Sequence, residues 1–254
     1  PFLALLVNFK DVKFTSETAN QDFFDLLNQE GYSQFGGTGS CRDYYYQNSN
    51  GIFDPTFEVY GPVDLPNNMA YYGGNDASGS DKNPRAMVYD GVKAAVETCG
   101  LDLSRFDCDG DGVLDNIFIF YAGYGEASGG PEDSIWPHQW VGYGTFNGVS
   151  IESYACGAEL RGNTGTLIDG IGTFTHEFGH VLGLPDFYDI DYQTNGEARA
   201  LRFYSLMDSG CYNNDSNTPP YLTSMERHLL GWSEGPVELT ESGSYALDPV
   251  QENS

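Results

Sequence analysis

Basic side chains are scarce in this sequence. Its 254 residues include 11 Lys and Arg against 37 Asp and Glu, so the formal net charge is −26. A protein that binds nucleic acid or an anionic membrane surface neutralises phosphates with basic side chains, whereas a surface this acidic repels them. We therefore expect no nucleic acid among the partners of this protein, and we expect its surface to attract cations.

Long apolar runs are also absent. A helix that spans a bilayer needs about 18 or more consecutive apolar residues, and the longest candidates, residues 3–9 and 117–122, have the length of strands. The first residues lack the basic segment and the small-residue cleavage site of a signal peptide, so they are predicted to form a buried strand. The sequence predicts a soluble protein without a transmembrane segment.

No two cysteines have the C-x-x-C spacing. The absence of this pair argues against a zinc site made of cysteines. An odd number of cysteines allows at most two disulfides and leaves at least one thiol unpaired, and the sequence does not select a pairing. The five residues are Cys41, Cys99, Cys108, Cys156 and Cys211.

Apolar residues are nevertheless plentiful enough for a full core. They make up 40% of the chain, and this length suits one large domain or two lobes around a cleft. The region between residues 36 and 81 is predicted to form strands with long aromatic loops, including the tyrosine clusters at residues 44–46 and 71–72. Periodicity predicts strands at residues 3–9 and 117–122 and helices at residues 22–27, 86–98, 175–182 and 222–230. This alternation favours a mixed lobe of helices and strands.

The segment His176-Glu177-Phe178-Gly179-His180 has the H-E-x-x-H pattern. On a helix, histidines four residues apart lie one turn apart on the same face, so both imidazoles can converge on one metal ion. Glu177 lies beside them, where a carboxylate can activate a metal-bound water. The alternative interpretation is a helix with two unrelated histidines.

The residues that follow extend this pattern. Gly183 stands three residues after His180 and Asp186 six residues after it, which reproduces the spacing H-E-x-x-H-x-x-G-x-x-H with aspartate in the last place. Glycine permits the left-handed turn that brings a third ligand back to the metal. Downstream, the segment 205–210 resembles a Met-turn, in which Met207 forms an apolar floor beneath the metal.

Together these motifs resemble those of the immune inhibitor A-like zinc metallopeptidases, secreted bacterial enzymes similar to metzincins. The similarity covers nearly the whole chain and includes residues 121–126, 135–138, 176–189, 204–207 and 229–232. It implies that His176 and His180 bind zinc and that Glu177 is the general base. It also implies that the strand at residues 117–122 lies along the cleft and pairs with an extended peptide substrate.

The resemblance implies an α+β, metzincin-like fold with a mixed twisted sheet, an active-site helix and a mostly irregular or helical C-terminal subdomain. Residues 1–182 would form the N-terminal subdomain and residues 183–254 the C-terminal one, with the cleft between them. The sequence departs from typical metzincins at the third zinc ligand, where Asp186 replaces histidine. Asp189 and Glu197 are the alternatives for this ligand.

Two further positions are ambiguous. Some metzincins have a tyrosine two residues after the methionine, where it stabilises the oxyanion, but this chain has Ser209 there, and Tyr204 and Tyr212 are the candidate substitutes. His138 lies in a segment with tryptophans on either side. Such a histidine is more often packed and hydrogen bonded in a core than a metal ligand.

The acidic loop, residues 107–115, contains a second cluster of candidate ligands. Counted from its first residue, Asp107, Asp109, Asp111 and Asp115 occupy positions 1, 3, 5 and 9 of a calcium loop, and Val113 occupies position 7, which contributes a backbone carbonyl. The residue at position 12 is not glutamate and a strand follows instead of a helix, so the loop is not an EF-hand. The alternative is a solvated acidic turn, although four close carboxylates repel one another unless a cation intervenes.

These patterns predict a secreted, monomeric, zinc-dependent endopeptidase of bacterial type that acts on proteins or peptides, with Zn²⁺ as the catalytic ion and Ca²⁺ as a structural ion. One alternative is a catalytically idle metallopeptidase fold that serves as a calcium-stabilised binding module or adhesin. Another is a zinc hydrolase of non-peptide amides or esters, which would use the same ligands.

Overall fold

A central sheet organises the molecule. The structure is a computed structural model that describes residues 1–191, 193, 200–235, 237–246 and 249. The five strands of the central sheet have the order β2-β1-β3-β7-β4. All neighbouring strands are parallel except β4, which runs antiparallel to β7. The strands are β1 (Phe2–Asn8), β2 (Phe57–Asp64), β3 (Ile117–Tyr124), β4 (His138–Val141) and β7 (Ser153–Leu160). The prediction of a mixed sheet is therefore confirmed.

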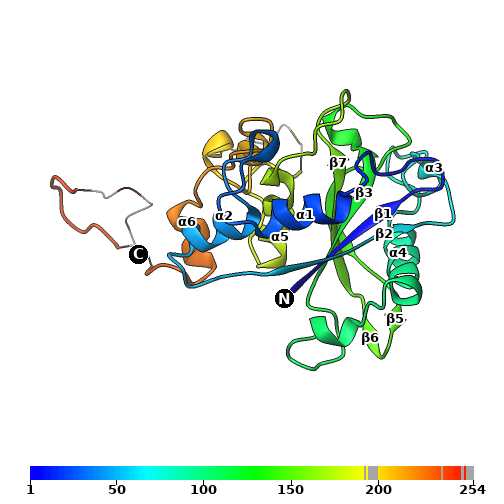
Figure 1. The fold of residues 1–254 in the computed structure, drawn as a ribbon. Coiled ribbons are helices and arrows are strands. Elements are labelled where there is room, and N and C mark those ends of the chain that lie inside the picture. Colours follow the sequence, from blue (N-terminus) through cyan, green and yellow to red (C-terminus); the bar gives the residue numbers. More distant parts are fainter. Residues whose placement is uncertain (192, 194–199, 236, 247–248, 250–254) are drawn as a thin grey trace.

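Helices cover both faces of this sheet (Figure 1). Side chains of a strand alternate between its faces. Leu5 and its alternate neighbours in β1 pack on α4 (Pro84–Thr98). Leu6 belongs to the opposite core, together with residues of α1 (Ala19–Asn28), α2 (Cys41–Asn48) and α5 (Ile171–Val181). The apolar run at the start of the chain is therefore a strand buried on both faces.

The remaining elements are short. A small hairpin is formed by β5 (Thr145–Phe146) and β6 (Val149–Ser150), and the short helices of the chain are α3 (Met69–Tyr72), α6 (Ser224–Leu229), η1 (Gln34–Gly36), η2 (Leu103–Phe106), η3 (Glu126–Ser128), η4 (Arg202–Tyr204) and η5 (Ser209–Tyr212). In the described ranges, no helix is long and apolar enough to cross a membrane.

The two tyrosine clusters lie in helices α2 and α3, so the prediction that they form loops is wrong. A capping box begins α2: the Ser40 side chain accepts from the backbone N–H of Asp43, and the Asp43 side chain accepts from the N–H of Ser40. This satisfies two N–H groups that a helix start leaves without partners. Within α2, Tyr45 is fully buried and donates to the carbonyl of Thr175 in α5, whereas Tyr46 faces solvent. Long-range packing thus overrides the local turn signals.

The position of β3 corrects a second expectation. The strand at residues 117–122 was expected to border the cleft and to pair with a substrate. It instead lies between β1 and β7 and pairs with both of them, so both of its edges are occupied. Among the described residues, β4 is the outermost strand next to β7, and its other edge has no partner strand.

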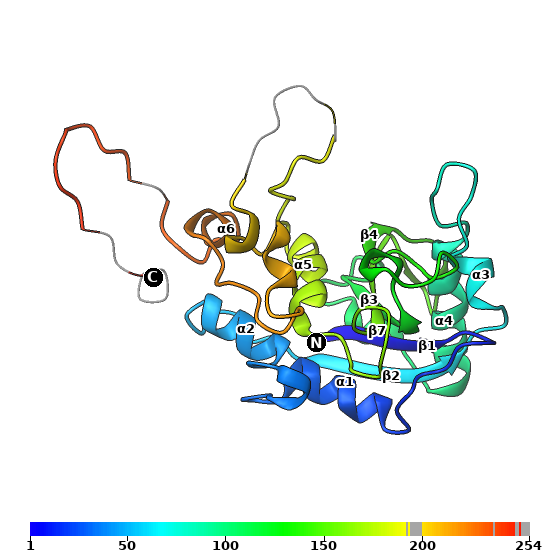
Figure 2. The ribbon, with the colours of Figure 1, turned by 90° about the horizontal axis from the view of Figure 1, so that it is seen from above.

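The segment after α5 packs beside that helix, on the side away from α4 (Figure 2). Leu184, Met207 and Leu222 are buried in the same apolar cluster as Phe178 of α5. The cluster therefore contains residues from both sides of the expected boundary at residues 182 and 183. The division into two subdomains stays a prediction.

All five cysteines are free thiols. Cys41, Cys156 and Cys211 are buried, and Cys99 and Cys108 are exposed. The odd number of cysteines in the sequence left their pairing open, and the structure contains no disulfide among these five residues.

Candidate metal centre

Helix α5 carries His176 and His180 and packs into the apolar cluster on the face of the sheet opposite α4. Ile171, Phe174 and Phe178 of this helix are buried in that cluster. The two imidazoles have their ring centroids 4.9 Å apart and are nearly perpendicular. The helix thus brings the two predicted ligands together, one turn apart.

Asp186 completes the group. Its Oδ1 atom lies 3.3 Å from Nε2 of His176 and 3.3 Å from Nε2 of His180. Gly183 has a φ of +101°, and its N–H donates to the carbonyl of His180, which ends the helix and turns the chain back. Asp189 is not part of this cluster of potential ligands, and the other alternative, Glu197, lies outside the described residues.

Backbone carbonyls orient both imidazoles. Nδ1 of His176 donates to the carbonyl of Leu206 at 2.9 Å, and Nδ1 of His180 donates to the carbonyl of Leu184 at 2.8 Å. Because a carbonyl only accepts, these bonds place the proton of each neutral ring on Nδ1 and leave the Nε2 lone pair for a metal. Both lone pairs then face Oδ1 of Asp186.

This arrangement fits a divalent cation. Oδ1 of Asp186 is buried and has no hydrogen-bond partner in the described part of the chain. In the neutral tautomers, three acceptor atoms therefore face one another, and only a metal ion or protons can hold them together. Protonation of a ring nitrogen is the other way to satisfy Oδ1: burial lowers the pKa of His176, but the hydrogen bond that the protonated ring can donate to Asp186, with further partners, outweighs burial and raises it to about 11. Protons and a metal ion thus compete for the same nitrogen atoms.

Glu177 lies next to these groups and is 8% exposed. Burial raises the pKa of its carboxyl group, while the charges of His176 and His180 oppose this shift. Its carboxylate forms no hydrogen bond within the described residues, so it remains available to a ligand at the centre. A carboxylate of this kind can accept a proton from a water molecule.

Met207 packs directly on the helix that carries the histidines. It is fully buried, and its Sδ atom lies 2.7 Å from the place that a Cβ at position 179 would take. Glycine at this position therefore allows the close approach. The backbone carbonyl of Met207 also accepts from the N–H of Phe187 at 2.8 Å, which ties the turn to the segment after Gly183.

Glu226 is a residue of this region that the sequence analysis missed. Its buried carboxylate accepts from Ser205 Oγ at 2.7 Å, from the N–H of Met207 at 3.1 Å and from the N–H of Thr223 at 2.6 Å. It thereby anchors the turn that carries the Leu206 carbonyl. The signal was present in the sequence, because Thr223 and Glu226 have the T-x-x-E spacing of a capping box at the start of α6.

His138 is packed and hydrogen bonded. One of its ring nitrogens lies 2.6 Å from the carbonyl of Trp136 and the other 2.6 Å from the hydroxyl of Tyr154. Burial lowers its pKa. Tyr204 and Tyr212 are 79% and 57% exposed, and their role as oxyanion donors stays a prediction.

The acidic loop brings three of its carboxylates together. Oxygen atoms of Asp107, Asp109 and Asp111 lie within 4.8 Å of one another. The backbone curls around the first of them, because the N–H groups of Gly110 and Gly112 donate to Asp107 at 2.9 and 3.0 Å.

The other two predicted ligands in this loop are placed differently. Asp115 is not part of the three-carboxylate group and accepts from the N–H of Cys108 at 3.0 Å. The N–H of Val113 donates to Asp111 at 2.8 Å, and Val113 forms an isolated bridge with Ser150. The loop is therefore attached to the edge of the small hairpin.

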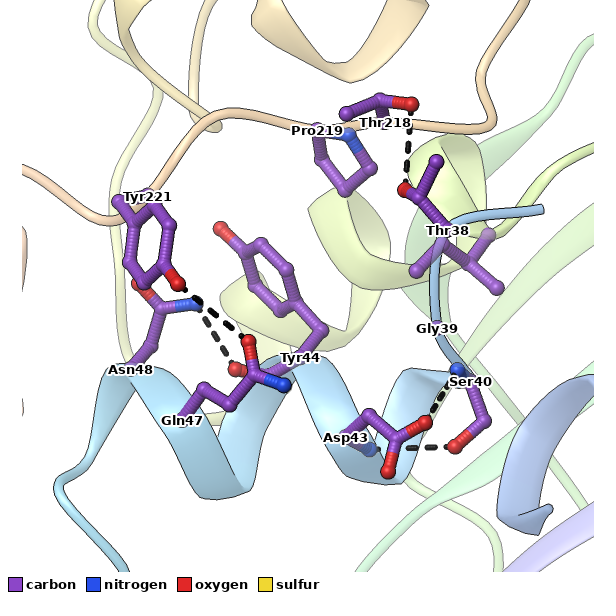
Figure 3. A pocket seen from close by; sticks show the side chains of 11 residues that line it. Thr38, Gly39, Ser40, Asp43, Tyr44, Gln47, Asn48, Thr218, Pro219 and Tyr221 are labelled. Atoms are coloured by element: carbon purple, nitrogen blue, oxygen red, sulfur yellow. Dashed lines mark hydrogen bonds between the residues drawn. The ribbon is translucent and has the colours of Figure 1, made fainter. Parts of the chain in front are cut away.

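A separate hollow of about 230 Å³ lies between α2 and the segment 218–221 (Figure 3). Its polar groups bind one another: Thr38 and Thr218 share a hydrogen bond of 3.1 Å, and Tyr221 donates to Gln47 at 3.4 Å. Because these groups already have partners, the hollow presents little that would hold a ligand.

The H-E-x-x-H helix, the returning aspartate and the mixed sheet define the class of metallopeptidase domains. The chain belongs to the immune inhibitor A peptidase M6 family, because the model of that family's catalytic domain matches residues 3–232. This match confirms the family predicted from the sequence, and it supports the prediction of a metalloendopeptidase.

Two curated relatives illustrate the family. Immune inhibitor A of Bacillus thuringiensis subsp. alesti is 33% identical over an alignment of 250 residues. The match covers 83% of this chain and 36% of that protein. Pre-pro-metalloprotease PrtV of Vibrio cholerae serotype O1 (strain M66-2) is 28% identical over 249 residues, which cover 83% of this chain and 27% of that protein. The chain thus spans about a third of the length of these relatives.

Proposed function

We propose that this domain is a zinc-dependent endopeptidase in which His176, His180 and Asp186 hold the metal. The observation that carries the proposal is the approach of both Nε2 atoms to 3.3 Å from a buried Oδ1 that has no other partner among the described residues. A bound zinc ion supplies Lewis-acid chemistry, because it polarises a carbonyl and acidifies water.

Glu177 supplies the proton transfers. Its carboxylate accepts the proton of the attacking water and then passes that proton to the leaving amine. The raised pKa of Glu177 supports this role, since a base whose pKa lies closer to neutral pH also serves better as the acid of the second step. Met207, buried against Gly179, would form the floor of a Met-turn of the metzincin kind.

The substrate would bind as an extended strand along β4. This edge has no partner strand within the described residues, and an extended peptide can add to such an edge through main-chain hydrogen bonds. Strand β4 and helix α5 would then form one side of the cleft, and the segment after Gly183 would form the other side. This role replaces the one expected for residues 117–122.

Calcium would bind at the acidic loop and stabilise it. The support is the approach of three carboxylates to within 4.8 Å of one another in a chain with a net charge of −26. We further propose that the protein is secreted and acts as a monomer. Its relatives come from bacteria, and one of them is named a pre-pro-metalloprotease.

Cleavage of a denatured protein by the purified chain, with and without a zinc chelator, tests the function. Glu177→Gln should lower turnover by at least ~10²-fold because it removes the base but no ligand. Zinc content by elemental analysis should stay the same. The exposed Glu17→Gln serves as the control and should behave as wild type. Near-normal turnover by Glu177→Gln would refute the assignment of the base, and chelator-resistant cleavage would refute the metal.

A further inference from the structure

A second pocket opens beside β4. It has a volume of about 390 Å³ and lies between the start of β4 and the segment that leads into α4. Its walls include Trp136 and Trp140, which are 53% and 48% exposed, and its polar lining includes Asp81 and Glu126. The pocket therefore combines aromatic walls with two carboxylates.

The carboxylate of Asp81 is only partly satisfied. Its Oδ2 atom accepts from the N–H of Trp136 at 3.1 Å, while its Oδ1 atom is buried without a hydrogen-bond partner in the described ranges. Burial raises its pKa to about 6, and the nearby charge of Glu126 adds to this shift. A buried carboxylate in this condition gains from a cationic partner.

The described part of the chain offers no such partner. Neither Asp81 nor Glu126 belongs to an ion pair there. The guanidinium of Arg85 lies 5.8 Å from the centre of the Trp140 ring, but it donates to the carbonyl of Gly142 and does not line the pocket. Apart from His138, whose pKa is lowered by burial, no basic side chain lines the pocket in the described part of the chain.

The chemistry favours an organic cation over a metal ion. Calcium takes six to eight oxygen ligands, whereas tryptophan faces attract ammonium and guanidinium groups. Lysine and arginine also carry an apolar stem that can lie along an aromatic wall while the charged end reaches a carboxylate.

The pocket lies where a bound peptide would place side chains. His138 and Trp140 of β4 both line it, and they pair across the sheet with Cys156 and Tyr154, which belong to the core beneath α4. A peptide strand on the outer edge of β4, visible in Figure 2 as the edge of the sheet away from β2, would direct alternate side chains to this same face. Helix α5, which carries the two histidines, packs on the opposite face of the sheet and also contacts β4, so the same strand borders both the pocket and that helix.

We propose that this pocket is a specificity subsite that binds a lysine or arginine side chain of the peptide substrate through Asp81, Glu126, Trp136 and Trp140. The inference rests on the proposed function, because it assumes that the substrate pairs with β4. Asp81 acts here as a specificity-determining residue and takes no part in the bond cleavage itself.

Paired peptide substrates test the subsite. The two peptides of a pair differ at one position, which is lysine in one peptide and norleucine in the other. Norleucine keeps the apolar stem and removes the charge. This position is moved, one residue at a time, along the residues that flank the cleaved bond. At one position, the wild type should show kcat/KM at least ~10-fold higher for lysine, and Asp81→Asn should reduce this ratio by roughly 10-fold. Glu126→Gln should reduce it less. The exposed Asp133→Asn is the matched control and should keep the wild-type ratio.

A wild type without a preference for lysine at any position would overturn the proposal, as would an unchanged ratio in both Asp81→Asn and Glu126→Gln. A calcium-dependent loss of thermal stability in Asp81→Asn with the ratio intact would point to a metal site and would also overturn it. Binding of the same peptides to Glu177→Gln, followed by tryptophan fluorescence, separates the two hypotheses. Lysine-selective binding without any turnover by the wild type would support the pocket and refute the proposed function.

Discussion

Replacing Glu226 with glutamine should loosen the turn that carries Leu206 and Met207. The buried carboxylate receives three hydrogen bonds, two at Oε1 and one at Oε2. Glutamine has nearly the same volume and retains one acceptor oxygen, so it can still bind Ser205 and Met207. Its amide group would then point a donor at the N–H of Thr223.

The expected cost follows from this geometry. One hydrogen bond to a charged group is lost and one donor is left unsatisfied, which costs about 1.5–3 kcal/mol. Since each kcal/mol lowers the melting temperature by roughly 2–4 °C in a protein of this size, Glu226→Gln should melt about 3–12 °C below the wild type. Glu226→Ala loses all three bonds and leaves a cavity, so its cost should reach about 4 kcal/mol or more.

The same change should weaken metal binding at the proposed centre. The Leu206 carbonyl orients His176 and lies between the two residues that Glu226 anchors. Loss of such a supporting contact lowers metal affinity by roughly 10–100-fold in known sites. Differential scanning calorimetry and competition with a zinc chelator measure the two effects, with Glu17→Gln as the control. If Glu226→Gln matched the wild type in both measurements, the assignment of Glu226 as the anchor of this turn would be wrong.

Other perturbations give separate tests. Asp186→Ala should lose zinc under dialysis that leaves Asp189→Ala loaded, and elemental analysis showing the reverse would refute the ligand assignment. Calcium removal should lower the melting temperature and increase autolysis, so identical melting curves with and without a calcium-selective chelator would count against a site in the acidic loop. Gly172→Ala should destabilise the fold by more than about 3 kcal/mol, measured by urea unfolding, because its Cβ would lie 1.9 Å from the carbonyl oxygen of Cys211. Burial raises the pKa of Glu177 above its ordinary value of 4.5, and only the ionised form accepts a proton. The kcat/KM value should therefore fall as the pH decreases, with a midpoint above pH 4.5. A midpoint at or below pH 4.5 would contradict the effect of burial on this pKa.

The parts of the centre that the sequence predicts are those that local spacing determines. His176 and His180 converge because a helix places residues four apart on one face, and Gly183 followed by Asp186 describes a turn that is complete within a few residues. The buried strands were predictable for the same reason, since continuous apolar runs of six or seven residues suit strands that are covered on both faces.

The parts that the sequence did not predict depend on distant contacts. Strand order is a tertiary property, so the apolar character of residues 117–122 showed that this strand is buried but not that two neighbours occupy its edges. The helix at residues 44–46 is stabilised by the distant contact of Tyr45 with α5, although the capping box between Ser40 and Asp43 at its start was a local signal that the prediction did not use. The T-x-x-E spacing of Thr223 and Glu226 indicated a capping box, but it did not indicate that Glu226 also binds Ser205, 21 residues earlier in the chain.

The residues that support the proposed metal centre come late in the chain, which has a consequence for protein synthesis. Residues 176–180 leave the ribosome before the groups that orient them: the carbonyl that holds His176 lies 30 residues further along, and Glu226 follows later still. Until that segment has been translated, no carbonyl group fixes the proton of the neutral His176 ring on Nδ1, so both tautomers are populated. The turn that contains Met207 also lacks its hydrogen bonds to Glu226. Domains fold as units as they emerge, so the nascent chain carries an intact motif without a preorganised centre. We therefore expect proteolytic activity to arise only after translation has passed α6.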